Sequence, residues 1–364
     1  MEYLNISNYK CLEKIQISGL KKVNLFTGKN NTGKSTILEA ISLFAYNGNF
    51  LWMFELLEGR GEVNNYRGEN VNEDTNIKLL STFFNNRNIS VSENSNIEVA
   101  SDIGFLSLRF VKFIEEDVYG NTLFDKEVVI GKKRIVVNEP YNTNFHYGFE
   151  IKNGNDTTLF PVDKDLFRRR ASNDSMINCN IINAKGYDIL SYASLWDRIT
   201  LSAKEVLVID ALKIIEPKIT GLSFIGEDSL KSERYPIVKL EGSPNLYPLK
   251  AMGDGVNRIL NFILALVNSD NGFLLIDEFE NGLHYSVQEK LWEIIFEISN
   301  RLNVQVFATT HSNDTINSFA RVLGKSKGFE GSLYRLDRKG DEVRTYMFPE
   351  EEIKEAAIQH INMR

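Results

Sequence analysis

The sequence predicts an α/β fold with a mixed sheet, an antiparallel β subdomain and an inserted helical region. Three observations lead to this prediction. A glycine-rich turn joins a strand to a helix near the start of the chain, stretches of alternating apolar and polar residues fill the middle, and apolar strands alternate with amphipathic helices towards the end. The 364 residues are enough for one large domain, and contents of 43% hydrophobic and 25% charged residues are ordinary for a globular protein.

The expected arrangement is a single domain over residues 1–364 with a discontinuous core. Its core comprises about residues 1–58 and 200–364, and an insertion of about residues 59–199 separates the two parts. The insertion is predicted because the composition becomes rich in asparagine, glycine and acidic residues after the first core segment.

The first strands of the chain lead into residues 28–36, which read GKNNTGKST. The preceding stretch, Val23 to Gly28, alternates and ends on glycine, which is typical of a buried strand running into a turn. After the turn, apolar residues recur at helical spacing, namely Ile37, Leu38, Ile41, Phe44 and Ala45.

This spacing between a strand and a helix is typical of a phosphate-binding loop. Glycines let backbone N–H groups surround phosphate oxygens, and the helix N-terminus adds the positive end of its dipole. We expect Lys34 to reach the β- and γ-phosphates of ATP and Ser35 to hold Mg²⁺. The alternative is a glycine-rich turn that matches the pattern by chance. The predicted ATP-binding residues are Gly28, Asn30, Asn31, Thr32, Gly33, Lys34, Ser35 and Thr36.

The middle of the chain predicts two different segments. Residues 59–98 indicate an insertion with little core of its own, whereas residues 99–160 alternate and predict an antiparallel subdomain in which IGKKR forms a hairpin turn. The dense basic clusters are GKKR (131–134) and FRRR (167–170), and each is expected to be a solvated loop or hairpin end. The net charge of −7 argues against wholesale coating of nucleic acid.

The last part of the chain alternates helices and strands. A helical region over about residues 187–215 precedes two predicted strands, ITGLSFIG and RYPIVKL, and a helix–strand–helix–strand pattern begins near residue 250. The strands FLLID and VQVFATTH are continuously apolar, as in strands buried on both faces of a parallel sheet.

Asp277 and Glu278 directly follow the first of these apolar strands. Two carboxylates at the end of a buried strand form the Walker B pattern that accompanies a phosphate-binding loop. We expect Asp277 to hold Mg²⁺ together with Ser35, and Glu278 to act in catalysis by orienting the water that attacks the γ-phosphate. The alternative is an ordinary strand that ends in a charged turn.

Two further segments are expected to lie near the bound ATP. His311 ends the second apolar strand, and side chains beyond the carboxyl ends of neighbouring strands face one crevice, so we expect His311 to be catalytic as a sensor of the γ-phosphate. A glycine turn opens a helix in AMGDGVNRIL (251–260), which makes a second anion site at a helix N-terminus. This signature loop is expected to meet the nucleotide of a second subunit through Gly253, Asp254, Gly255 and Arg258.

The sequence indicates a cytoplasmic protein without a membrane partner. The apolar run ILNFILALV (259–267) is too short to cross a bilayer, and the first ten residues lack the features of a signal peptide. Cys11 and Cys179 lie far apart without a recognisable spacing, so reduced thiols are expected.

Several motifs in this order resemble the ABC-class ATPases of the OLD (overcoming lysogenisation defect) type. They are NYKCLE, GKNNTGKSTILEA, SLWDRITLSAKE, MGDGVNR, LLIDEFENGLH and ATTHS, and the resemblance covers residues 1–45 and about 180–364. This family is related to the SMC heads and includes the ATPase subunits of bacterial anti-phage systems such as PARIS. The resemblance implies a P-loop ABC-type ATPase head that binds ATP and Mg²⁺ and forms a homodimer or higher homo-oligomer with ATP at the interface.

The same resemblance implies an effector protein, a nuclease or toxin. Since no acidic cluster with the spacing of a TOPRIM nuclease is visible, we expect the effector to be separately encoded, and contact with DNA stays open. Two departures concern the nucleotide contacts. No glutamine lies between Gln16 and Gln288, so the Q-loop glutamine is absent or replaced, and Gly253 stands where the signature serine usually contacts the γ-phosphate.

Three other functions stay open on the sequence. An SMC-like ATPase of DNA repair or recombination would be expected to carry long coiled coils and a basic groove, and neither is visible. A nucleotide-binding subunit of a transporter would be expected to carry an LSGGQ-like signature and a shorter distance than that from Ser35 to Asp277. A binding module without activity would not need Lys34, Glu278 and His311 together.

Overall fold

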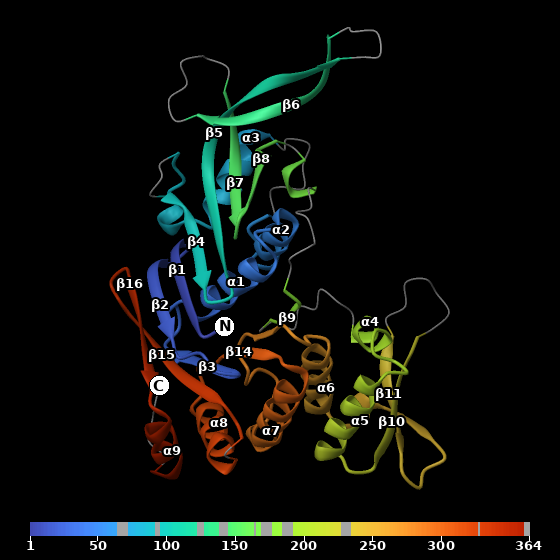
Figure 1. The fold of residues 1–364 in the computed structure, drawn as a ribbon. Coiled ribbons are helices and arrows are strands. Elements are labelled where there is room, and N and C mark those ends of the chain that lie inside the picture. Colours follow the sequence, from blue (N-terminus) through green and yellow to red (C-terminus); the bar gives the residue numbers. More distant parts are fainter. Residues whose placement is uncertain are drawn as a thin grey trace.

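The structure is a computed structural model that describes most of the chain. The described residues form three β-sheets and the helices that pack against them (Figure 1). The described residues are 1–63, 72–91, 95–121, 127–137, 145–163, 165–168, 177–183, 192–226, 234–326 and 328–359. In the described part, a central mixed sheet lies below a larger antiparallel sheet in Figure 1, and a small sheet lies at one side, next to helices.

Five parallel strands and one antiparallel strand form the central sheet. Their spatial order is β16 (Glu342–Phe348), β15 (Gly331–Lys339), β3 (Val23–Gly28), β14 (Gln305–Thr309), β13 (Phe273–Ile276) and β9 (Cys179–Ile182). β9 comes from the segment 59–199 that was expected as an insertion, so this segment contributes a strand to the central sheet.

Helices cover both faces of the central sheet, which explains its continuously apolar strands. Leu274 and Ile276 of β13 belong to one hydrophobic core, whereas Phe273 and Leu275 belong to the other. The helices are α1 (Lys34–Ala45), α2 (Phe50–Gly59), α3 (Glu73–Ser81), α4 (Tyr192–Asp197), α5 (Ala203–Ile215), α6 (Asp254–Val267), α7 (Tyr285–Leu302), α8 (Asn313–Lys325) and α9 (Glu350–Gln359), with short 3₁₀ turns at Asn85–Arg87, Leu166–Arg168 and Leu249–Met252.

The antiparallel sheet and the small sheet come mostly from the predicted alternating stretches. The small sheet contains β10 (Ile219–Ile225), β11 (Tyr235–Leu240) and β12 (Leu246–Pro248). The antiparallel sheet has the order β2 (Leu12–Ser18), β1 (Tyr3–Tyr9), β4 (Ile97–Ser101), β5 (Gly104–Asn121), β7 (His146–Asn153) and β8 (Asp156–Pro161), and β6 (Glu127–Val137) pairs with β5.

The predicted hairpin turn at IGKKR is wrong, because these residues lie inside β6. Lys132, Lys133 and Arg134 pair in register with Asp117, Glu116 and Glu115 of β5, so the basic cluster faces an acidic cluster across two strands. Opposite charges on paired strands stabilise the extended conformation that the turn prediction overlooked. Of the other basic cluster, Phe167 and Arg168 lie in a 3₁₀ turn and residues 169–170 lie outside the described residues.

Residues 59–98 were predicted to have little core of their own, and the described part of this segment shares its core with the first strands and α1. Its apolar side chains join the hydrophobic core that also contains residues of β1, β2 and α1, and the rings of Phe83 and Phe84 lie 6.2 Å from those of Tyr9 and Phe149, respectively. The buried side chains are Val63, Leu80, Phe83, Phe84 and Ile97, each at most 2% exposed.

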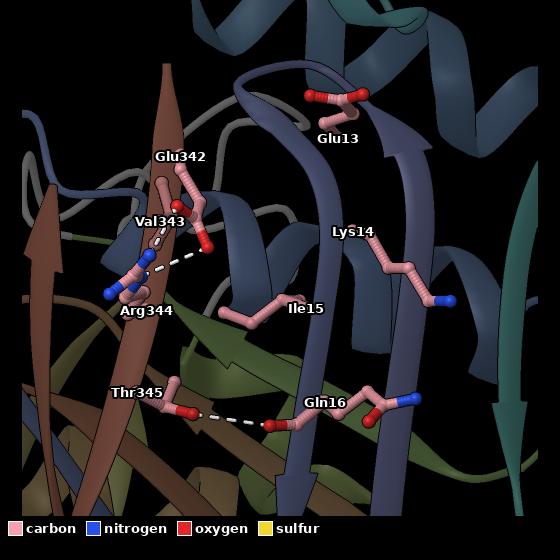
Figure 2. A pocket seen from close by; sticks show the side chains of 8 residues that line it. All are labelled: Glu13, Lys14, Ile15, Gln16, Glu342, Val343, Arg344 and Thr345. Atoms are coloured by element: carbon pink, nitrogen blue, oxygen red, sulfur yellow. Dashed lines mark hydrogen bonds and ion pairs between the residues drawn. The ribbon is translucent and has the colours of Figure 1, made fainter. Parts of the chain in front are cut away.

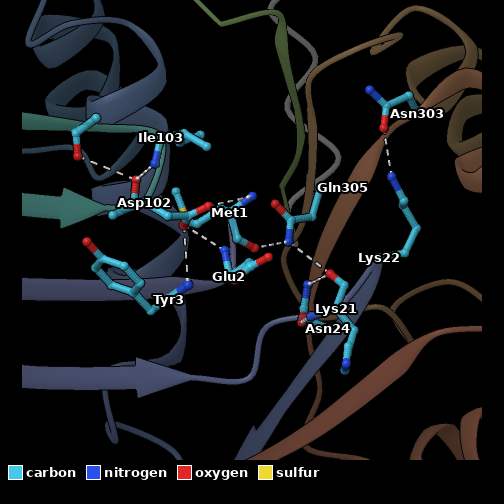
Figure 3. A network of polar contacts seen from close by, with 12 residues as sticks. Met1, Glu2, Tyr3, Lys21, Lys22, Asn24, Asp102, Ile103, Asn303 and Gln305 are labelled. Atoms are coloured by element: carbon cyan, nitrogen blue, oxygen red, sulfur yellow. Dashed lines mark hydrogen bonds and ion pairs between the residues drawn. The ribbon is translucent and has the colours of Figure 1, made fainter.

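Polar contacts join the antiparallel sheet to the amino-terminal end of the central sheet (Figure 3). The side-chain amide of Gln305 donates to the carbonyl oxygens of Met1 and Lys21 at 2.7 and 2.9 Å. Asp102, in the turn between β4 and β5, accepts the N–H of Glu2 at 2.7 Å. These bonds fix the start of β1 against β14, at the end of the sheet opposite to its carboxyl edge.

The free edges of the two large sheets also approach one another at one side of the molecule. Thr345 of β16 donates its hydroxyl to the carbonyl oxygen of Gln16 of β2 at 3.1 Å, and a shallow pocket opens beside this contact (Figure 2). Side-chain hydrogen bonds from β14, β15 and β16 therefore hold the central sheet against the antiparallel sheet.

Candidate functional site

Three neighbouring strands bring the predicted site residues to one edge of the central sheet. β14 lies between β3 and β13 and is parallel to both. The segments that follow these strands begin at Lys29, Asp277 and Thr310, so they leave the sheet side by side at its carboxyl edge. This is the edge at which open α/β sheets bind their ligands.

The loop after β3 has the backbone conformation that phosphate binding requires. Asn31 and Gly33 have positive φ angles of 62° and 91°, and α1 begins directly after Gly33. A Cβ atom at Gly28, whose φ is 144°, would lie 2.4 Å from the carbonyl oxygen of Leu336 in β15. Only glycine fits this close approach between the loop and its neighbouring strand. A helix N-terminus stabilises an anion, because its first N–H groups have no partner within the helix, and α1 starts at the end of this loop.

Lys34 is held over this loop by backbone carbonyl groups. Its Nζ donates to the carbonyl oxygens of Gly28 and Lys29 at 2.8 and 2.9 Å. Thr32 donates its hydroxyl to the same carbonyl oxygen of Lys29 at 2.9 Å, which closes the turn. The positive charge therefore lies at the place where phosphate oxygens would collect.

Ser35 and Asp277 meet directly, although 242 positions separate them in the sequence. The Ser35 hydroxyl donates to Oδ1 of Asp277 at 2.9 Å, and the Thr309 hydroxyl donates to the same oxygen at 2.7 Å. This oxygen-only set suits Mg²⁺, which is usually held by one or two protein oxygens, waters and the phosphates of its substrate. In the described residues no group of three or more His, Cys, Asp or Glu residues could hold a metal by itself.

Glu278 has a backbone conformation that is rare for a residue with a side chain. Its φ is 53°, and its N–H donates to the Thr309 hydroxyl at 2.9 Å. Phe279 then turns back into the core, where its ring stacks on Trp292 at a centroid distance of 3.9 Å. The buried ring and the Thr309 bond together hold Glu278 in its left-handed conformation, and strain of this kind is common in functional sites.

His311 is held by Glu280, a residue that the sequence did not point to. Nδ1 of His311 lies 2.8 Å from Oε1 of Glu280, and the backbone N–H of His311 donates to the same oxygen at 2.8 Å. Thr310 donates its hydroxyl to the other carboxylate oxygen at 2.7 Å. The predicted site residues are thus held in place by hydrogen bonds to Thr309, Thr310 and Glu280. In the sequence, only the polar character of these three residues within the two motifs could have indicated this role.

The signature loop begins α6 in the expected way. Gly253 has a φ of 107°, and a Cβ built at Gly253 or Gly255 meets no atom of the described residues within 4 Å, apart from the chain next to it. The side chain of Asp254 lies outside the described part of the chain, although its backbone begins α6.

Arg258, one turn further along α6, lies beside the loop that follows Asp277 and Glu278. Its Cδ is 4.0 Å from the position that a Cβ of Gly282 would occupy, and its guanidinium lies 5.4 Å from the centroid of the Phe262 ring. Nε and Nη2 of Arg258 are buried without a hydrogen-bond partner among the described residues. Burial lowers the pKa of Arg258. The helix of the signature loop is thus in contact with the Walker B loop.

The fold and this site define a nucleotide-binding ATPase of the P-loop type. A model of the family described as AAA ATPase domain matches residues 1–228, which is more than half of the chain. The chain therefore belongs to the AAA ATPase domain family, and its activity is ATP hydrolysis. A second family model, described as AAA domain, putative AbiEii toxin, Type IV TA system, matches residues 191–317.

Known proteins are similar in sequence to most of the chain or to part of it. An ATP/GTP phosphatase of Helicobacter pylori (strain ATCC 700392 / 26695) is 23% identical over 382 residues and covers 95% of each chain. The methionine import ATP-binding protein MetN 2 of Listeria monocytogenes serovar 1/2a is 25% identical over 130 residues, which are 36% of each chain.

Solved structures that align with the chain include SMC heads. The SMC head bound to the C-winged helix domain of ScpA aligns with 96% of this chain and 98% of its own, at 14% identity and a TM-score of 0.48. The SMC head domain of Thermotoga maritima covers 96% and 98%, at 11% identity and a TM-score of 0.43. Separately, no helix within the described ranges is long and apolar enough to cross a membrane.

Proposed function

We propose that this ATPase is a sensor or scaffold of an anti-phage defence system and controls a separately encoded effector such as a nuclease or toxin. The observation that carries the enzymatic part is the double hydrogen bond to Asp277 Oδ1, from Ser35 at 2.9 Å and Thr309 at 2.7 Å. It joins the phosphate-binding loop to the Walker B strand in the arrangement that hydrolysis needs. The defence part is supported by the order of motifs and by a matching family whose description includes a toxin.

Each site residue has a role in the proposed reaction. Lys34 binds the β- and γ-phosphates, since its amine already lies over the loop. Ser35 and Asp277 hold Mg²⁺, which when bound neutralises phosphate charge during the transfer of the phosphoryl group to water. Glu278 orients the attacking water and accepts its proton, and His311 contacts the γ-phosphate.

The remaining ATP-binding residues act mainly through the backbone. Gly28 and Gly33 allow the positive φ angles of the loop, and the N–H groups of this loop and of the first turn of α1 donate to the phosphates. This group comprises Gly28, Asn30, Asn31, Thr32, Gly33 and Thr36.

We further propose that ATP is hydrolysed between two copies of the chain. The signature loop would then contact the nucleotide of the partner copy through Gly253, Asp254, Gly255 and Arg258. A Cβ built at Gly253 or Gly255 meets no described atom within 4 Å, which supports a surface that another molecule can approach. The minimal assembly is a homodimer, and larger homo-oligomers can be built from it.

The defence proposal is tested with the natural locus, including the neighbouring genes, transferred to a phage-sensitive host. Plating efficiency of a phage panel should fall by orders of magnitude with the parent locus and return to the control level with Lys34→Ala or Glu278→Gln. Deleting the neighbouring gene for the effector should have the same result. Equal plating with parent and Lys34→Ala loci would refute the defence role.

An SMC-like ATPase of DNA repair or recombination is the second candidate. The position of the insertion between the two halves of the head supports it, because that is where a coiled coil would emerge. However, the described helices between α1 and α4 have at most 10 residues, too few for a coiled coil. This candidate predicts sensitivity to DNA-damaging agents after deletion of the gene, without an effect on phage plating. A transporter subunit is a weaker third candidate, supported by the partial match to MetN 2.

A further inference from the structure

Glu280 contacts the end of β14 through both of its carboxylate oxygens. Oε2 accepts the hydroxyl of Thr310 at 2.7 Å, and Oε1 accepts the backbone N–H of His311 at 2.8 Å. The same Oε1 lies 2.8 Å from Nδ1 of the His311 ring. The Glu280 side chain is only 13% exposed, so these three contacts use a carboxylate that has been largely removed from water. A charge in this position needs its hydrogen bonds, because burial without them is costly.

The contact between Glu280 and the imidazole ring determines which ring nitrogen of His311 carries a proton. A carboxylate can only accept a hydrogen bond, so the nitrogen that faces it must carry a proton. Nδ1 is therefore the protonated nitrogen towards Glu280, and Nε2 lies on the other side of the ring. The His311 side chain is 43% exposed, so its outer part is accessible to a ligand from the crevice.

We propose that Glu280 is a positioning residue that fixes both the orientation and the tautomer of His311. It holds the backbone and the ring of His311 at one oxygen, so that Nε2 is presented to the γ-phosphate. In contact with phosphate, Nε2 carries a second proton and donates it in a hydrogen bond, and the resulting imidazolium is stabilised by the carboxylate on its other side. This inference rests on the proposed role of His311 at the γ-phosphate.

In many functional sites, a carboxylate accepts a hydrogen bond from the histidine nitrogen that does not contact the ligand, and this bond fixes the orientation of the ring. Where such a carboxylate orients a metal-binding histidine, its loss typically lowers activity by about 10–100-fold. We expect a similar factor for Glu280→Ala, expressed in kcat rather than in KM, because the loop and Lys34 still bind the rest of the triphosphate.

The tautomer can be measured without any ATP hydrolysis. The chain has four histidines, so selective ¹⁵N labelling gives a simple spectrum, and His311→Asn identifies the signals of His311. Long-range ¹H–¹⁵N correlations should show protonated Nδ1 for His311 in the parent protein. In Glu280→Ala the Nε2–H form should gain population, whereas Glu280→Gln keeps an acceptor oxygen and should keep the parent pattern.

Thr310→Val is the matched control. It removes the hydroxyl contact to Glu280 but leaves the two bonds to His311, so the tautomer and most of kcat should persist. In steady-state assays, Glu280→Ala and His311→Ala should lower kcat by similar factors, and the double variant should be no slower than His311→Ala alone.

Two results would overturn the inference: an unchanged Nδ1–H signature in Glu280→Ala, or losses of kcat that multiply in the double variant. Failure of the proposed function is distinguishable from both. If Glu280→Ala changes the tautomer while His311→Ala hydrolyses ATP like the parent, positioning by Glu280 is upheld and the role of His311 in hydrolysis is refuted.

Discussion

Replacing Thr309 by valine tests whether the end of β14 organises the Walker B carboxylates. Valine has nearly the same shape, and Thr309 is fully buried, so the main change is the loss of one hydroxyl. That hydroxyl donates to Asp277 Oδ1 at 2.7 Å and accepts the N–H of Glu278 at 2.9 Å. One substitution therefore removes a support of the predicted metal ligand and a support of the predicted base.

The size of the effect follows from these two bonds. A hydrogen bond to a charged group contributes about 1.5–3 kcal/mol, and an N–H left unpaired in a buried place costs about 1–3 kcal/mol. Since the two overlap in one side chain, we expect a loss of about 2–4 kcal/mol in the free energy of unfolding, or a few degrees in Tm. Misplacement of Asp277 and Glu278 should lower kcat by about 10–100-fold and raise the Mg²⁺ concentration needed for half-maximal rate.

Thr310→Val is the control, because Thr310 is equally buried and its hydroxyl donates to Glu280 at 2.7 Å instead. Phosphate release would be measured at saturating ATP over a series of Mg²⁺ concentrations, with thermal unfolding of each variant followed in parallel. We expect a changed Mg²⁺ dependence for Thr309→Val alone. If both variants lose stability alike and both keep the parent's Mg²⁺ dependence, Thr309 supports only the fold.

Three further predictions concern the remaining parts of the site. Lys34→Ala removes a charged contact to the β- and γ-phosphates, and we expect ATP affinity, measured by calorimetry, to fall by about 10–100-fold; unchanged affinity would contradict phosphate binding by this loop. Glu278→Gln keeps the size of the side chain but not the base, so hydrolysis should drop by about 10²–10⁴-fold while ATP binding persists and a dimer accumulates in size-exclusion chromatography with ATP and Mg²⁺. A Cβ at Gly255 meets no described atom within 4 Å, so Gly255→Trp adds a bulky side chain at the proposed interface, and ATP binding should persist while hydrolysis and ATP-dependent association are lost; a variant that associates like the parent would remove the signature loop from the interface.

The sequence was sufficient to predict the elements that surround the nucleotide site. The phosphate-binding loop has a spacing set by the geometry of phosphate contact, and the strand before Asp277 is apolar because both of its faces are buried. Such requirements are local and are visible in a short stretch of residues. That Ser35 and Asp277 lie together was likewise predictable, and the structure places the Ser35 hydroxyl oxygen 2.9 Å from Oδ1 of Asp277; their binding of one Mg²⁺ stays a prediction.

The supports of these residues were not predictable, because they depend on contacts between distant segments. Glu280 differs from a solvated acidic residue only through its bonds to Thr310 and His311, which lie 30 and 31 positions further on. The misplaced hairpin has the same cause. A glycine followed by basic residues is typical of a turn, but pairing of Lys132 with Asp117 and of Arg134 with Glu115 favours a continuous strand.

The register of β14 explains how its last residues reach both the phosphate-binding loop after β3 and the Walker B residues after β13. Ala308 pairs with Ile276 of β13 and Thr309 pairs with Phe26 of β3, so the next residues of β14 emerge between the phosphate-binding loop and the Walker B loop. Because side chains of a strand alternate between its faces, a shift by one residue would turn the Thr309 hydroxyl away from Asp277. We therefore expect hydrolysis to depend on the alignment of a strand that carries neither of the two motifs, and variants of its last residues should separate nucleotide binding from turnover.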